Sequence, residues 1–205
     1  MKWGAVVVGA GFGVLITAAF SVDAADRPAA EIGQLSQPPE LDGTIDAAEW
    51  AEATVLDTPF VQIEPEFGQP SPFRTVIRIA QTETALYVAI EAFDPDSDRL
   101  SVAATARDGD MDRDDSVAVM IDTFLDRRTG YVFRTNAIAT QWDARIADNG
   151  KVEDVLWDSQ WRCASQRFDD RWIAEFEVPF AVLRFRAGSG KIWGLSFLRE
   201  VPRRL

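Results

Sequence analysis

Short runs in which apolar residues recur at every second position dominate this chain. In the run 75–79 the recurring residues include Ile77 and Ile79, and the run 86–92 begins with Leu86. Such alternation is typical of strands, and turn residues such as Gly, Pro and Asp separate the runs. Later runs cover residues 117–121, 131–135, 141–146, 162–168, 172–178 and 192–198. Long helical patterns do not alternate with these runs, so the chain is predicted to be all-β, folded as an antiparallel, jelly-roll-like β-sandwich.

One short helix is expected ahead of these runs. Leu41-Asp42-Gly43 is a turn signal, and Asp46 with Glu49 has the spacing of a capping box. The helix is predicted to run from Ala47 to about Ala53, with Trp50 on its inward face as a core residue.

The first 24 residues have the features of a signal peptide. Lys2 supplies a positive charge, residues 3–20 carry no charge, and Val22-Asp23-Ala24 places small residues at the cleavage positions. The uncharged run is about long enough to anchor the protein in a bilayer, but the sequence favours cleavage. The expected organisation is a signal peptide over 1–24, a linker over 25–39 and one β-sandwich domain over 40–205. The protein is then exported to the periplasm or the outer membrane, with no membrane span left after cleavage.

The charge of the chain restricts its partners. The chain has 21 basic and 33 acidic residues, a net charge of −12. Removal of the first 24 residues takes away Lys2 and Asp23 together, so the net charge does not change. Such a surface repels nucleic acid and anionic lipid head groups, and a neutral or cationic ligand is expected.

Two residue types exclude common kinds of site. The chain has no histidine, which removes the commonest zinc ligand and the Ser-His and Cys-His dyads. Its single cysteine, Cys163, cannot form an intrachain disulfide and is expected to lie in a strand as a small apolar residue. Catalysis would have to depend on carboxylates, lysine or tyrosine.

An acidic loop precedes the run at 117–121, and its aspartates are Asp108, Asp110, Asp112, Asp114 and Asp115. The first three have the alternating spacing of a calcium loop, and carboxylate oxygens are the ligands that calcium prefers. An EF-hand would need glycine in place of Arg113 and glutamate in place of Val119. The candidate is therefore a calcium site of another kind, formed by Asp108, Asp110 and Asp112 with Asp114. The alternative is a solvated turn whose charge Arg107 and Arg113 partly neutralise.

Three tryptophans lie beside acidic residues, namely Trp142, Trp157 and Trp161. Sugar rings stack their axial C–H groups on aromatic faces, while neighbouring carboxylate, amide and guanidinium groups bind the hydroxyls. The three residues are therefore candidates for a saccharide site. The alternative is that they seal the sandwich, although it would be unusual for all three to be fully buried.

A pair of glutamates gives a catalytic interpretation. Glu175 and Glu177 share one face of the run 172–178, with β-carbons about 7 Å apart by strand geometry, a spacing that a glycosidase could use. The same spacing is typical of a half-exposed strand in which Trp172 and Phe176 face inward and both glutamates face water. The second interpretation is favoured.

Several motifs follow one another in a recognisable order. They are Leu41-Asp42-Gly43 with Trp50, Asp114-Asp115-Ser116-Val117 leading to Ile121-Asp122-Thr123-Phe124, Tyr131-Val132-Phe133 with Asn136, Trp157-Asp158 with Trp161, Trp172 with Glu175, Pro179-Phe180 with Leu183-Arg184-Phe185, and Trp193-Gly194 with Phe197 and Arg199. In this order they resemble family 9 carbohydrate-binding modules, over about residues 38–203. The resemblance implies a non-catalytic antiparallel β-sandwich that holds sugar chains between two tryptophans, with calcium in a structural role.

The versions that the chain resembles most stand ahead of an outer-membrane β-barrel in large exported proteins. On local chemistry, Trp142 and Trp157 are assigned to stacking, with Arg107 as the partner of hydroxyl or ring oxygens. Asn136 and Trp161 complete the candidate site. The chain departs from those relatives at Asn136-Ala137-Ile138-Ala139, where they tend to have Asn-Pro-x-Gly, and it stops at Leu205, about where they continue towards the barrel.

Three functional hypotheses remain. The leading one is an exported, non-catalytic domain that binds an oligo- or polysaccharide during carbohydrate utilisation. The second is an accessory domain of an outer-membrane assembly, or the start of a barrel protein, whose sugar site has decayed. The third, a glycosidase that uses Glu175 and Glu177, ranks well below the others because no acid pair lies in a recognisable active-site motif.

Overall fold

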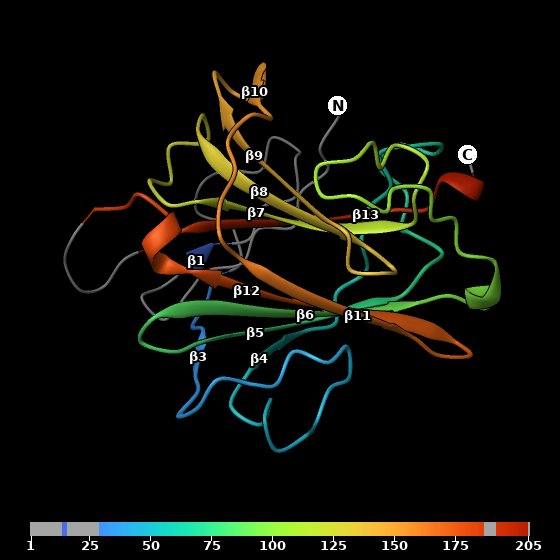
Figure 1. Cartoon of the computed structure of the whole chain (residues 1–205), viewed down its shortest axis with the longest axis horizontal. Helices are drawn as coiled ribbons and strands as arrows, with labels where there is room; N and C mark the ends of the chain where they lie inside the picture. Colours follow the sequence, from blue (N-terminus) through green and yellow to red (C-terminus); the bar gives the residue numbers. More distant parts are fainter. Residues whose placement is uncertain (1–13, 16–28, 187–191, 205) are drawn as a thin grey trace.

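Two β-sheets lie face to face in the computed structural model, which describes residues 14–15, 29–186 and 192–204 (Figure 1). In the described part of the chain, the first sheet has the strand order β10-β9-β8-β7-β13-β1-β2 and the second the order β11-β12-β6-β5-β3, with β4 paired to β5. The first sheet contains β1 (Val14–Leu15), β2 (Ala29–Ala30), β7 (Ser116–Asp122), β8 (Gly130–Asn136), β9 (Gln141–Ala147), β10 (Val152–Asp154) and β13 (Gly194–Glu200). The second contains β3 (Gly33–Gln34), β4 (Thr54–Leu56), β5 (Thr75–Gln81), β6 (Ala85–Phe93), β11 (Arg162–Arg167) and β12 (Arg171–Pro179).

The strand pairing confirms the predicted all-β sandwich. The eight predicted runs coincide with β5, β6, β7, β8, β9, β11, β12 and β13. Their pairings are antiparallel, and the consecutive strands β5–β6, β7–β8, β8–β9 and β11–β12 pair with each other. The short contacts of β1 with β13 and of β3 with β5 are parallel. The period-two pattern therefore predicted the strands that build the two layers.

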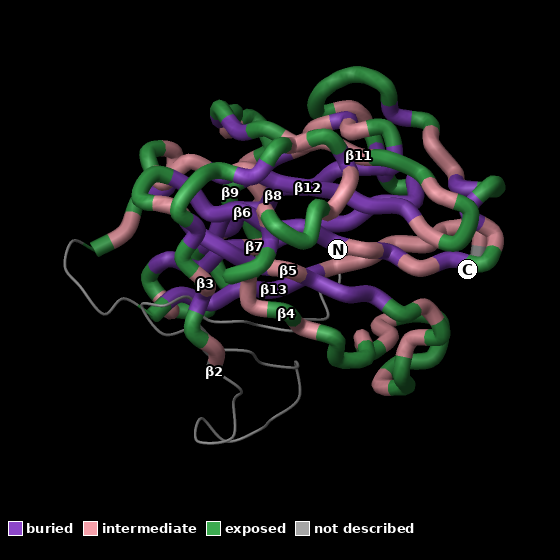
Figure 2. Tube along the Cα trace, turned by 90° about the horizontal axis from the view of Figure 1, so that it is seen from below, coloured by how far each residue is buried: buried purple, intermediate pink, exposed green. Residues whose placement is uncertain are grey.

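The main core lies between the two sheets, where the strands are buried (Figure 2). Phe133 on β8 and Phe176 on β12 face each other across the layers, and the ring of Trp161 packs between them. Each such apolar side chain contributes about 1.5–3 kcal/mol when it leaves water. This packing fixes the spacing between the sheets.

Residues 47–52 form hydrogen-bonded turns instead of the predicted helix. Asp46 does begin the segment, because its Oδ1 accepts the backbone N–H of Ala48 at 2.6 Å. The strand β4 starts at Thr54, however, and leaves too little chain for a helix. Trp50 is 3% exposed, as predicted for a core residue, but it packs on the outer face of the second sheet beside Tyr87. A second, smaller core thus covers that face.

Three further turns are 3₁₀-helical, η2 (Ser97–Arg99), η3 (Phe180–Val182) and η4 (Pro202–Arg204). The predicted leader lies outside the described residues except for Val14–Leu15, which pair with Gly194 and with residues 29–30. Part of the predicted linker belongs to the fold, since Ile32 and Leu35 are buried against it. No helix among the described residues is long and apolar enough to cross a membrane.

Candidate functional site

Arg107 brings together three segments that are distant in sequence. Its guanidinium donates to Oε1 of Gln141 at 2.6 Å, to Oδ1 of Asp158 at 2.6 Å and to the carbonyl oxygen of Ser159 at 2.9 Å. It also donates to Oδ1 of Asp143. The loop before β7, the strand β9 and the segment after β10 therefore meet at one arginine, which keeps about a third of its side chain exposed, at 32%.

Asp143, on the buried side of Arg107, holds its guanidinium in place. Its carboxylate is buried and accepts hydrogen bonds from the Ser159 backbone N–H at 2.9 Å, the Ser159 hydroxyl at 3.1 Å and Nε1 of Trp161 at 2.9 Å. Burial raises the pKa of Asp143, while the Trp161 hydrogen bond and the Arg107 charge act in the opposite direction. A carboxylate with this many donors holds Arg107 in one orientation.

Trp157 lies next to this cluster on the segment that crosses from β10 in the first sheet to β11 in the second (Figure 1). Its ring packs at 5.1 Å on Tyr131 and at 6.0 Å on Phe133, and the residue is half-buried. Its neighbours Leu156 and Asp158 are exposed. Asp158, the next residue, binds the guanidinium of Arg107. A half-buried indole offers an apolar face and a fixed guanidinium offers N–H donors, which are the groups that a sugar ring needs.

Trp161, by contrast, belongs to the core. It is 4% exposed, and its ring stacks on Phe176 with centroids 5.7 Å apart and planes 8° apart. Phe133 covers it from another side, at 5.4 Å. This packing places Trp161 in the core, and its contact with a sugar stays a prediction.

Asn136 is also buried, at 0% exposure. Its Nδ2 donates to the carbonyl oxygen of Ala104 and to Oδ2 of Asp114, both at 2.8 Å, and its Oδ1 accepts the backbone N–H of Thr140 at 3.0 Å. These contacts close the β8–β9 turn and tie it to the acidic loop. Asn136 therefore stabilises the loop, and its part in a sugar site stays a prediction.

Trp142 and Trp157 lie on opposite faces of the first sheet. Trp142 precedes Asp143 on β9, so its side chain points away from the core, and it packs with Met120 and Leu198 on the outer face. Trp157 packs on the inward-facing rings of β8. The two tryptophans assigned to stacking are both half-buried, but they cannot close on the same sugar ring in this arrangement.

The aspartates of the acidic loop have separate partners. Asp114 accepts the backbone N–H groups of Ala103 at 2.6 Å and Ala104 at 3.1 Å, and Asp115 accepts that of Ser101 at 2.7 Å. Within the described ranges, no group of three or more acidic or thiol side chains could hold a metal ion. Calcium binding by Asp108, Asp110, Asp112 and Asp114 stays a prediction.

Glu175 does not face water as expected. It is 0% exposed, because the turn at residues 42–43 covers it, and its Oε2 accepts the backbone N–H groups of Asp42 at 3.0 Å and Gly43 at 2.8 Å. Burial raises the pKa of Glu175 to about 7 against these hydrogen bonds. Glu177 is bound to Arg162, with Nε donating at 2.6 Å. The two glutamates thus take part in structural contacts.

Sequence reasoning missed Asp143, Gln141 and Ser159, the residues that orient Arg107. Strand alternation places Gln141 and Asp143 on the same face of β9, which is the one signal that could have grouped them. It could not identify their partner, because Arg107 is 34 and 36 residues away in the chain.

Comparisons with known proteins agree with this architecture. A family model described as "Carbohydrate family 9 binding domain-like" matches residues 41–199. A family 9 carbohydrate-binding module from Caldicellulosiruptor kristjanssonii in complex with cellotriose has 19% identity and a TM-score of 0.54, covering 81% of this chain and 73% of that chain. The same organism's module in complex with glucose gives 19% identity and a TM-score of 0.53, covering 80% and 75%. A proposed carbohydrate-binding protein from Bacteroides uniformis ATCC 8492 has 15% identity and a TM-score of 0.62, covering 84% and 83%. A comparison with curated proteins found no match.

Proposed function

The chain belongs to the carbohydrate family 9 binding domain-like family, and from this premise we propose that it binds a saccharide at the Arg107 surface, formed by Arg107, Gln141, Trp157 and Asp158. The observation that carries the proposal is the fixed guanidinium of Arg107, which binds Asp158, the residue that follows the half-buried Trp157. Buried Asp143 pre-orients the arginine, so little side-chain freedom is lost when a ligand binds.

The ligand that we propose is a neutral glucan oligosaccharide. Two structural relatives are complexes with cellotriose and with glucose. The net charge of −12 supports a ligand without negative charge. Trp157 would stack on one sugar ring, and Arg107 and Asp158 would bind the hydroxyls at its edge.

Binding in this proposal involves no bond cleavage. Asp143 is committed to four donors beneath the surface, and Glu175 is covered by the turn at 42–43. Neither is free to act as a general acid at the Arg107 surface. This agrees with a family of binding domains.

Titration with glucose, cello-oligosaccharides and xylo-oligosaccharides, followed by tryptophan fluorescence and calorimetry, tests the proposal. We expect Trp157→Ala to weaken binding of the best ligand by about fivefold, because stacking on one aromatic ring contributes about 1 kcal/mol. Arg107→Lys keeps a positive charge near Asp143 but loses the planar fork, and it should weaken binding as well.

Trp142→Ala is the matched control, since it removes a half-buried tryptophan from the opposite face of the same sheet. It should leave affinity within about twofold. The absence of any response to the glycan panel, or a loss of binding with Trp142→Ala alone, would overturn the assignment of the site.

Two further parts of the proposal concern location and calcium. The uncharged run 3–20 behind Lys2 supports export, to the periplasm or the outer membrane. Calcium binding at the acidic loop is supported by the exposed side chains of Asp108, Asp110 and Asp112. A calcium-dependent rise in melting temperature that is lost in the double variant Asp110→Asn/Asp112→Asn would support it, and identical melts with calcium and with EDTA would refute it.

A second candidate function is an accessory domain of an outer-membrane assembly, in which the sugar site has decayed. The observation that favours it is the position of Trp142 and Trp157 on opposite faces, so that no pair of these rings encloses a ligand. Under this alternative the protein should co-purify with envelope proteins and give no calorimetric response to any glycan.

A further inference from the structure

A groove of about 1000 Å³ lies between the loop at residues 60–73 and the end of β13. Phe60, Ile63, Phe73, Leu198 and Pro202 supply much of its apolar lining. Pockets that hold ligands commonly have volumes of about 300–1,000 Å³ and mostly apolar walls. None of the residues of the Arg107 surface lines this groove, so it is a separate site.

Acidic residues predominate in the groove. Glu64, Glu66, Asp112 and Glu200 line it, and the first three are exposed. The buried Arg134 pairs with Glu200 and lies 4.0 Å from Asp112, so the acidic rim of the groove is Glu64 and Glu66. Arg199 is the one basic residue in the lining, and its side chain is 4% exposed. Its guanidinium donates to the carbonyl oxygen of Phe93 at 2.9 Å and to neighbouring groups, so it does not offset the acidic rim. A ligand that fills the groove should carry positive charge.

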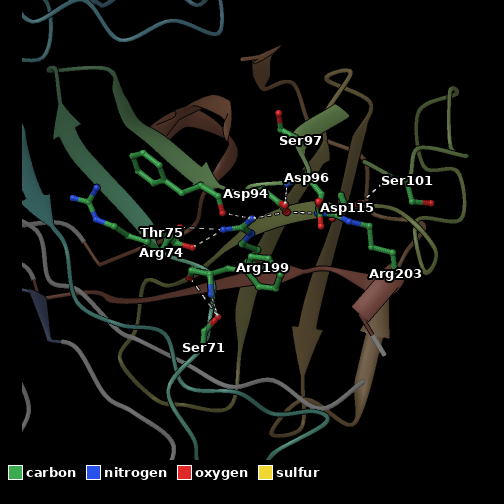
Figure 3. A network of polar contacts seen from close by, with 12 residues as sticks. Ser71, Arg74, Thr75, Asp94, Asp96, Ser97, Ser101, Asp115, Arg199 and Arg203 are labelled. Atoms are coloured by element: carbon green, nitrogen blue, oxygen red, sulfur yellow. Dashed lines mark hydrogen bonds and ion pairs between the residues drawn. The ribbon is translucent and has the colours of Figure 1, made fainter. Parts of the chain in front are cut away.

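One wall of the groove is rigid. Asp94, which is 1% exposed, accepts hydrogen bonds from Arg199 and Arg203, and Arg203 also donates to Asp115 (Figure 3). Figure 3 shows these side chains converging: Asp94 follows β6, Asp115 precedes β7, Arg199 lies on β13 and Arg203 lies in η4. The network fixes Pro202 and the end of β13, so this wall is formed before any ligand arrives.

The other wall has an unusual pattern. In residues 61–67 the apolar positions Val61, Ile63, Pro65 and Phe67 alternate with polar positions, two of which are Glu64 and Glu66. Such alternation normally buries one face, yet Val61 is 39% exposed and Phe67 is 68% exposed. The loop closes on itself through an isolated antiparallel bridge between Val61 and Pro70. Val61, Ile63 and Pro65 of this row line the groove, and a partner that fills the groove would cover them.

We propose that this groove binds an extended segment of a partner protein in which lysine or arginine alternates with apolar side chains. The apolar residues would pack on the proline and phenylalanine lining, and the basic residues would pair with the acidic rim. A neutral sugar fits less well, because it needs donors as well as acceptors. Arg199 is committed, and the Gln62 amide already donates to the carbonyl oxygen of Pro70 at 2.9 Å.

Fluorescence anisotropy with a panel of labelled synthetic hexapeptides, alternating Lys or Arg with Leu or Phe, tests the proposal on the purified protein. We expect binding that weakens about tenfold or more in the double variant Glu64→Lys/Glu66→Lys. The matched control, Glu52→Lys/Glu83→Lys, makes the same change of charge at exposed positions outside the groove, and it should bind within about twofold of the unmodified protein.

Peptides in which Ser replaces Leu and Phe have the same charge and should bind at least about tenfold more weakly, because they cannot fill the apolar lining. The proposal is overturned if no peptide of the panel binds or if both double variants weaken peptide binding equally. It is also overturned if an oligosaccharide binds to the unmodified protein and this binding is lost in the double variant Glu64→Lys/Glu66→Lys. Trp157→Ala should leave peptide binding intact, so this test and that of the Arg107 surface fail independently.

Discussion

Oε2 of Glu175 accepts the backbone N–H of Gly43 at 2.8 Å, joining β12 to a turn 132 residues earlier in the chain. The adjacent N–H of Asp42 donates to the same oxygen at 3.0 Å. The contact fixes the N-terminal segment over the outer face of the second sheet, where Trp50 completes the smaller core. A buried carboxylate thus holds the turn at residues 42–43 against this sheet face.

This carboxylate should make stability depend on pH. Burial raises the pKa of Glu175 from 4.5 to about 7, so the folded state holds a proton that the unfolded state releases between these values. Stability contributed by the protonated form is fully present below pH 4.5 and falls as pH rises towards 7. The side chain of Glu175→Gln cannot titrate. Relative to the unmodified protein, the free energy of unfolding of this variant should therefore rise with pH over this range, by about 3 kcal/mol at most.

Urea denaturation at several pH values between 4.5 and 8 measures the difference. The gap between the free energies of unfolding of Glu175→Gln and the unmodified protein should widen with pH. Parallel curves would contradict the assignment of the raised pKa to Glu175. Near-UV circular dichroism of the variant controls for changes in tertiary packing.

Asp143 and Asp158 both bind Arg107, but they should contribute differently to stability. Asp143 is buried and also accepts Nε1 of Trp161, whereas the side chain of Asp158 is 70% exposed. Asp143→Ala leaves buried donors unpaired and should lower the free energy of unfolding by about 3 kcal/mol. Asp158→Ala removes a solvent-screened partner and should cost about 0.5 kcal/mol. Equal losses in chemical denaturation would show that the network is not centred on Asp143.

The alternation of residues allowed the strands to be predicted, because facing one core imposes a period of two on each of them. The partners of individual side chains could not be predicted in the same way. Arg107 reaches Ser159 across 52 residues, and nothing in the local sequence of either residue indicates this contact. Trp142 and Trp157 look alike beside their acidic neighbours, yet strand phase places one outside and the crossing segment places the other against the core rings.

Alternation also says which face a residue occupies and not what covers that face. Glu175 lies on the outer face, as predicted, but the turn at residues 42–43 packs over it. The capping signal at Asp46 is real, since its side chain accepts the N–H of Ala48. The predicted helix over residues 47–53 was still wrong, because the length of a helix depends on where the next strand must begin, and β4 begins at Thr54.

Position 43 requires glycine for two reasons, its left-handed backbone conformation and the lack of room for a Cβ. Its φ is +81°, and a Cβ at this position would lie 2.6 Å from the backbone nitrogen of Gln166. Gly150 has the same φ of +81°, but nothing lies within 4 Å of its Cβ position. Gly150→Ala should cost about 1 kcal/mol for the left-handed conformation, and Gly43→Ala about 3 kcal/mol or more, because it adds overlap with fixed backbone. Thermal melts of the two variants should differ accordingly, and equal shifts would contradict the crowding.

The export proposal predicts the mass of the mature protein. When the full chain is expressed in a Gram-negative host, mass spectrometry of the periplasmic and outer-membrane fractions should find a chain that begins after Ala24. The strands that build both layers begin at Gly33 or later, apart from β1 and β2, so the processed protein should stay folded. Recovery of the unprocessed chain in the inner membrane would instead favour an uncleaved anchor.

Replacement of Ala139 by glycine should stabilise the protein. It lies in the β8–β9 turn with φ +60°, a left-handed conformation that costs a residue with a Cβ about 1–2 kcal/mol. Its N–H donates to the carbonyl oxygen of Asn136 at 3.1 Å, so the turn geometry is fixed by hydrogen bonding. Ala139→Gly relieves the strain at an entropic cost of about 0.5–1 kcal/mol, and it should raise the free energy of unfolding by about 0.5–1 kcal/mol.

Ala137→Gly, two residues earlier, is the control. Ala137 is 4% exposed and packs in the main core, so loss of its methyl group should lower the free energy of unfolding by about 1 kcal/mol. Opposite signs for the two variants in urea denaturation are the expected result, and destabilisation by both would mean that the turn tolerates Ala139 without strain.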